Sequence, residues 1–159
     1  MDNEMNLELF QPNLMIEKAK QEIRICDSIS EKYGLSLSEQ EIAELVECRQ
    51  NALSASGRVE FAGGILPKLI YAFCDSPYID QSNYADTLAE LQEAFYYYKT
   101  DSMDRFSDDE LIEFMVKVFN GRAQGSTEYL IGTSLASLCR LQEKSLILMM
   151  LTKRVIYFE

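Results

Sequence analysis

Residues 57–79 read GRVEFAGGILPKLIYAFCDSPYI, and this stretch decides the fold. Gly63-Gly64 interrupts regular structure, and residues 65–74 are then apolar on nearly every face. A helix that is apolar all round is a buried helix. Pro67 fits only in a first turn, where its missing N–H costs no hydrogen bond. Asp75-Ser76-Pro77 ends the run, so the stretch predicts a short, buried, central helix that starts near residue 65.

Two helices are predicted before this centre. Apolar residues recur at three- and four-residue spacing over about 13–33, and Gly34 follows as a C-terminal stop. Ser38 with Glu41 has the capping-box pattern, which predicts a second helix over about 39–56. Because the link between these helices is short, we expect them to pack as an antiparallel hairpin.

Three helices are predicted after the centre, over about 81–99, about 107–120, and from residue 126 or 127 through Leu141. Ser107 with Glu110 is a second capping-box pattern at the start of the middle one. The fold class is therefore mainly α, a compact single-domain bundle of about six helices over residues 1–159. Residues 1–12 are expected to be flexible.

The tail, residues 141–159, has no single predicted structure. Residues 146–159, LILMMLTKRVIYFE, fit either a continued helix or a terminal strand, since 155–158 favour β-structure. Val59 and Phe61 alternate with charged residues, so 58–61 could pair with 155–158. A minor two-stranded β ribbon is thus an open alternative at this point.

The charge of the chain restricts its partners. Fifteen Lys and Arg against 26 Asp and Glu give a net charge of −11. Such a chain repels the phosphates of nucleic acids and anionic membrane surfaces. The longest late apolar run, residues 146–151, is far shorter than the ~20 residues that span a bilayer. We expect no nucleic-acid partner and no membrane.

The charges are also unevenly placed. Residues 101–113 hold six acids and one base, whereas residues 140–154 hold four bases and one acid. The basic end could dock on an acidic face of its own body or of a second copy. The alternative is two unrelated solvated faces.

The cysteine and histidine counts argue against common cofactors and mechanisms. The cysteines, at positions 26, 48, 74 and 139, show no metal-binding spacing, and no cofactor or metal is predicted. Histidine is absent, which excludes Ser-His-Asp and Cys-His mechanisms within one chain. The first ten residues carry acids where a signal peptide needs bases. These features predict a cytoplasmic protein with reduced thiols. They favour a protein that is not an enzyme, and no catalytic residue is identified.

One candidate ligand site surrounds the Gly63-Gly64 turn. Backbone N–H groups and a lysine near a helix start favour anions, although the GxxxxGK[ST] and GxGxxG patterns are absent. The alternative is a glycine turn that admits close helix packing. The residues that could form the site are Arg58, Glu60, Lys68 and Asp75, with Tyr71 or Tyr78 as a polar wall.

The acids from Asp101 to Asp109 resemble a calcium-binding loop only in composition. In the EF-hand register, the third and fifth positions counted from Asp101 are Met103 and Arg105, which cannot supply the required oxygens. We interpret these acids as helix-capping residues.

Three consecutive tyrosines, Tyr96, Tyr97 and Tyr98, span about 200° of a helix and cannot share one face. Tyr98 follows the apolar stripe, so Tyr96 or Tyr97 lies at an edge or outside. Exposed tyrosine is favoured at protein interfaces. Packing in a second core layer is the alternative.

Three segments, GRVEFAGGILPKLIYAFCDSPYI, NYADTLAELQEAFYYYK and SMDRFSDDELIEFM, resemble an uncharacterised family of small proteins from anaerobic Gram-positive bacteria. The resemblance covers about residues 13–140, and the tail from Leu141 departs from it. A domain of unknown function implies no activity, cofactor or catalytic residue for this chain.

Two hypotheses follow. The first is a cytoplasmic, non-enzymatic helical protein that binds another protein or itself, since its sequence lacks catalytic and cofactor motifs and carries a tyrosine-rich helix. The alternative is a small-molecule or anion-binding domain, or a weak enzyme, around the Gly63-Gly64 turn.

Overall fold

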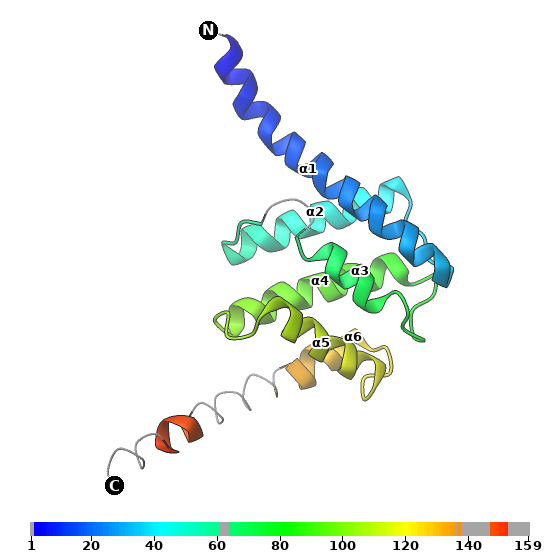
Figure 1. Ribbon diagram of the computed structural model, residues 1–159, viewed down its shortest axis with the longest axis vertical. Helices are drawn as coiled ribbons and strands as arrows, with labels where there is room; N and C mark the ends of the chain where they lie inside the picture. The colour runs from blue at the N-terminus through cyan, green and yellow to red at the C-terminus, as the bar shows by residue number, and fades with distance from the viewer. Residues whose placement is uncertain (1, 61–63, 136, 138–146, 153–159) are drawn as a thin grey trace.

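The structure, a computed structural model, describes residues 2–60, 64–135, 137 and 147–152. Within these residues the chain is mainly helical, as predicted, and its helices pack as a bundle (Figure 1). The elements in chain order are α1 (Asp2–Ser30), η1 (Glu31–Tyr33), α2 (Glu39–Ser56), α3 (Leu66–Phe73), α4 (Tyr84–Asp101), α5 (Asp108–Asn120), α6 (Thr127–Tyr129) and η2 (Leu130–Leu135).

Helix α3 lies at the centre of the bundle, where it contacts α1, α4 and α5. Its apolar side chains Leu66, Leu69, Ile70 and Phe73 are fully buried. Pro67 lies in the first turn, so the sequence located this helix correctly. One face nevertheless reaches solvent, because Lys68 and Tyr71 are exposed.

Helices α1 and α2 are joined by a short link. Gly34 adopts a left-handed φ of 76° at the end of η1, and Leu35 and Leu37 in the link are buried. Helix α1 begins at Asp2, before Pro12 and thus earlier than predicted, and its first turns extend beyond the bundle (Figure 1). The expected flexibility of residues 1–12 stays a prediction.

Both capping predictions locate helix starts. At α2, the Ser38 Oγ accepts a hydrogen bond from the Glu41 N–H at 3.1 Å, and the Glu41 carboxylate accepts one from the Ser38 N–H at 3.0 Å. At α5, the Ser107 Oγ accepts one from the Glu110 N–H at 3.1 Å. Helix α4 lies between α2 and α5 and packs against both.

The end of the chain departs from the predicted sixth helix. Helix α6 has only three residues and passes into the wider π-helical turns of η2, with Leu130 fully buried. Residues 147–152 form a further helical turn. The later part of the predicted helix, 138–141, lies outside the described residues.

The predicted β ribbon is not supported. Residues 58–60 are irregular, and no strand occurs in the part of the chain that the structure describes. Phe61 and residues 155–158, the rest of the ribbon, lie outside it. Among the same described residues, no helix combines the length and apolar character that a membrane crossing needs.

Candidate functional site

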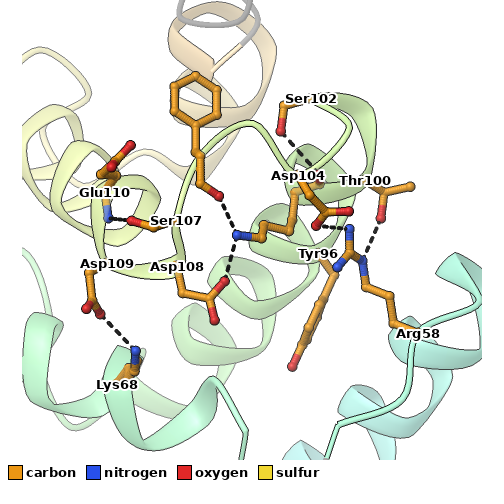
Figure 2. Close-up of polar contacts among 12 residues, drawn as sticks. Arg58, Lys68, Tyr96, Thr100, Ser102, Asp104, Ser107, Asp108, Asp109 and Glu110 are labelled. Carbon is orange, nitrogen blue, oxygen red and sulfur yellow. Dashed lines mark hydrogen bonds and ion pairs between the residues drawn. The ribbon is translucent and has the colours of Figure 1, made fainter.

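The two bases of the opening stretch pair with acids of the turn that follows α4 and of the first turn of α5, a region we call the acidic turn (Figure 2). Arg58 donates from Nη2 to Asp104 Oδ1 at 2.6 Å and from Nε to Thr100 Oγ1 at 3.0 Å. Lys68 Nζ donates to Asp109 Oδ1 at 2.9 Å. Figure 2 shows these two ion pairs as separate groups, so Arg58 and Lys68 do not share a site.

A third base, Lys99, neutralises the same acidic turn. Its Nζ lies 2.8 Å from Asp108 Oδ1 and also donates to the carbonyl of Phe106. Three acids of the stretch 101–113 are therefore paired with bases of the bundle itself: Asp104, Asp108 and Asp109. This stretch offers less free negative charge to a partner than its sequence indicates.

Glu60 lies in a buried polar cluster with Arg49 and Tyr96. The Tyr96 hydroxyl donates to Glu60 Oε2 at 2.6 Å, and Arg49 Nη2 lies 3.7 Å from the same oxygen. Burial, and then the hydrogen bond to the Glu60 carboxylate, raise the pKa of Tyr96 far above its ordinary value. Arg49 and Tyr96 are each 1% exposed, whereas the Glu60 side chain is 24% exposed, so the cluster is largely but not wholly buried.

Gly64 closes over this cluster. Its φ is +55°, and a Cβ atom there would lie 2.2 Å from Glu60 Oε2 and 2.6 Å from Arg49 Nη2. The glycine thus permits close packing of polar side chains against the chain, which is the structural alternative considered for this turn. Gly63 lies outside the described residues.

The remaining candidate residues are dispersed. Asp75 is exposed, and Tyr78 packs edge-on against Phe119. Only Lys68 and Tyr71 meet, at a depression of about 620 Å³ between α3 and α5. The described part of the chain therefore does not gather Arg58, Glu60, Lys68 and Asp75 into one pocket.

A second hollow of similar size, a groove of about 650 Å³, lies between α2 and α4. We call it the α2/α4 groove. Its lining residues on α2 are Glu44, Glu47, Cys48, Asn51, Ala52, Ala55 and Ser56, and those on α4 are Glu93, Tyr96, Tyr97, Thr100 and Asp101.

The α2/α4 groove is acidic with a partly apolar lining. Four carboxylates line it, from Glu44, Glu47, Glu93 and Asp101, and no lysine or arginine is among its lining residues. Tyr97 is 63% exposed and presents its ring there, whereas Tyr96 is buried. Nowhere in the described residues do three Cys, Asp or Glu side chains gather so as to hold a metal ion.

Cys48 lies on the α2 wall of the groove, and its thiol faces α4. Its Sγ donates to Glu93 Oε1 at 3.6 Å. Burial, together with the negative charge of Glu93, raises the pKa of the Cys48 thiol. Since the thiolate is the nucleophilic form, this thiol is a hydrogen-bond donor across the groove and not an activated nucleophile.

Sequence reasoning named Tyr96 and Tyr97 but missed the acids beside them. A signal was present, because Glu44, Glu47 and Asn51 are spaced three and four residues apart, and Glu93, Tyr97 and Asp101 are each spaced four residues apart. Such spacing places side chains on one helix face. Which two faces would meet depends on how α2 and α4 pack, and this the periodicity alone does not determine.

Comparison with known proteins supports one assignment. Neither the curated proteins nor the solved structures contain a match to this chain. Residues 22–145, well over half of the chain, match the model of a family of unknown function, DUF6323. The family that the three sequence segments resemble is thus supported by a match to a defined family of unknown function. Residues 146–159 lie beyond the match. The chain belongs to the DUF6323 family.

Proposed function

We propose that the protein acts by protein–protein interaction, and that its α2/α4 groove binds a basic, amphipathic segment of a partner. The observation that carries the proposal is the lining of the groove, where four carboxylates occur without a base. Complementary charge guides association and selects partners. An acidic groove favours a partner segment rich in lysine and arginine.

The shape of the groove supports a helical ligand segment. Two long helices form its walls, and the small side chains of Ala52 and Ala55 leave room between them. An amphipathic helix that lays its apolar face into a groove is a common mode of recognition. The exposed ring of Tyr97 offers the kind of aromatic contact that is enriched at interfaces.

A non-enzymatic role fits the chemistry of the groove. Its one thiol, Cys48, has a raised pKa, and the sequence contains no histidine that could act as a base. The same carboxylates oppose the binding of phosphates, which weighs against the anion-binding alternative and against nucleic acids. The dispersed positions of Arg58, Glu60, Lys68 and Asp75 lend that alternative no support.

We also propose that the protein works in the cytoplasm of an anaerobic Gram-positive bacterium. Cys26, Cys48 and Cys74 are free thiols. Unpaired cysteines are typical of a reducing compartment. The taxonomic part rests on the sequence resemblance alone.

A peptide titration tests the proposed groove. The probe is a fluorescent, amphipathic helical peptide with lysines on its polar face, added to the full chain and followed by anisotropy. We expect saturable binding, which Glu47→Lys weakens by at least about tenfold, or about 1.4 kcal/mol. The reason is that this substitution places a positive charge in the groove.

The matched control is Glu128→Lys, which makes the same change of charge at an exposed position on α6, outside the groove. It should bind the peptide like the unaltered chain. Equal losses in both variants, or equal binding of a peptide with glutamates in place of the lysines, would contradict the proposal.

A further inference from the structure

Residues 147–152 form a helical turn whose apolar side chains are open to solvent. Ile147, Leu148, Met149, Met150 and Leu151 are each between 54% and 68% exposed. At about 100° per residue, five consecutive helical residues surround the turn, so its exposed surface is apolar on every side. Exposed apolar surface of this kind is typical of a site that contacts another molecule.

This turn stands apart from the bundle of its own chain. Figure 1 shows it, in red, well away from α2 and α4, whose facing sides form the groove. Its side chains therefore do not occupy that groove within the same molecule. Residues 147–152 are not among the residues that line the groove.

The sequence around the turn supplies the charge that the groove lacks. Lys144 precedes it, and Lys153 and Arg154 follow it directly. In a chain with 26 acids and 15 bases, this segment is an exception, since residues 144–154 contain three bases and no acid. The chain thus contains a segment of the chemistry that the α2/α4 groove favours, apolar and basic.

We propose that residues 147–152 of one copy dock in the α2/α4 groove of a second copy. This inference rests on the proposed function and names the occupant of the groove. The apolar side chains of the turn would cover Ala52, Ala55 and the ring of Tyr97, and the bases that flank the turn in the sequence carry the charge opposite to that of the four carboxylates. Exchange of identical segments between copies is a low-cost route to association.

Other acidic or hollow surfaces match the turn less well. The depression between α3 and α5 is lined by Lys68 and Lys117 as well as Asp109 and Glu113, so its charges balance. The acidic turn after α4 is already paired with Arg58, Lys68 and Lys99. Of these three surfaces, charge favours the α2/α4 groove.

Cross-linking between two differently marked copies tests the proposal. One full-length copy carries Ala55→Cys in the groove, and the other carries Met150→Cys in the turn. Both contain Cys48→Ser and Cys139→Ser, while Cys26 and Cys74 are buried. A short bismaleimide should join the two copies, with the linkage between positions 55 and 150 identified by mass spectrometry.

The matched control replaces Ala55→Cys by Lys32→Cys, an exposed position outside the groove, and should give no specific product. A chain that carries both Ala55→Cys and Met150→Cys and links only within itself would overturn the proposal in favour of its own tail. Absence of any linkage between 55 and 150 would also overturn it.

Light scattering on the unaltered chain gives an independent reading. We expect association that the single change Leu148→Glu reduces at least tenfold, because this substitution puts an acid into the apolar turn.

The peptide titration separates the self-docking inference from the proposed function of the groove. A groove that binds the lysine peptide while the chain stays monomeric removes only the self-docking inference. A groove that binds neither the peptide nor the turn removes both.

Discussion

At Gly64, both the backbone conformation and the lack of space for a side chain favour glycine. It has a left-handed φ of +55° and lies against Glu60 and Arg49. Gly57 has a similar φ of +67° but no atom within 4 Å of the position of a Cβ. The two glycines therefore separate the cost of the backbone conformation from the cost of crowding.

We predict that Gly57→Ala lowers the free energy of unfolding by about 1–2 kcal/mol, the ordinary cost of a left-handed conformation. Gly64→Ala should lower it by roughly twice as much, because the new methyl group also displaces the Glu60 carboxylate from Tyr96. Urea denaturation of the two variants measures both values. Equal losses would show that the buried polar cluster adapts without cost.

Tyr84 makes the stability of the fold sensitive to alkaline pH. Burial raises its pKa from 10.0 to about 12. Between these values the unfolded chain has lost the phenol proton while the folded chain retains it. The free energy of unfolding should therefore fall as the pH rises above 10, by up to about 1.4 kcal/mol per pH unit from this group.

We predict that Tyr84→Phe flattens this alkaline decline. At neutral pH the change should cost little, since the Tyr84 Oη is buried without a hydrogen-bond partner among the described residues. Urea denaturation at a series of pH values on both sides of 10 measures the slope. Tyr33→Phe, at a tyrosine that is 55% exposed, is the matched control. A slope as steep in Tyr84→Phe as in the control would show that Tyr84 is not the source of the alkaline decline in stability.

The candidate site was only partly predictable at this scale. The 3.6-residue period shows that Tyr96, Tyr97 and Tyr98 diverge, and the structure buries Tyr96 and Tyr98 while exposing Tyr97. The period does not show that the face with Tyr97 would meet Glu44 and Glu47. That meeting depends on contacts between residues far apart in the sequence.

At the scale of elements, local signals located the helix starts. The capping box of Ser38 and Glu41 acts within one turn, so the sequence alone contains it. We predict that Ser38→Ala destabilises the fold by about 1 kcal/mol, because the Glu41 N–H loses its acceptor.

Chemical denaturation checks this value against Ser36→Ala. Ser36 is exposed and bonds to Gln81 only through its backbone, so its substitution should have almost no effect. If the two variants lose equal stability, the hydrogen bond at the start of α2 does not support the fold.

Where local signals were weak, the predicted elements were less accurate. Alternation of apolar and charged residues at 58–61 is typical of a strand, yet residues 58–60 are irregular and Arg58 extends to Asp104. Two short alternating segments far apart in the sequence form a ribbon only if the fold brings them together. The helical bundle instead uses the first of them as a link between α2 and α3.

At the scale of the whole molecule, the distribution of charge predicts how association depends on salt. In the proposed docking, the acidic groove of one copy attracts the bases that flank residues 147–152 in the sequence of the other copy. Near 1 M salt the screening length falls to about 3 Å. We predict that light scattering detects weaker association there than at low salt.

Charge variants identify the source of this salt effect. Glu47→Lys should weaken association at low salt and reduce its salt dependence, whereas Glu128→Lys should retain both. Association that strengthens steadily with salt in the unaltered chain would indicate an apolar contact without charge complementarity.

The separation of the turn from the groove has a further consequence for the sizes of the assemblies. In the proposed docking, the turn and the groove are different surfaces, so one contact leaves a free groove on one copy and a free turn on the other. Reciprocal exchange between two copies closes the assembly, whereas successive one-way contacts build an open polymer. Each added copy brings a net charge of −11, so repulsion grows with every step of polymerisation. This rising repulsion favours short, closed assemblies over long polymers.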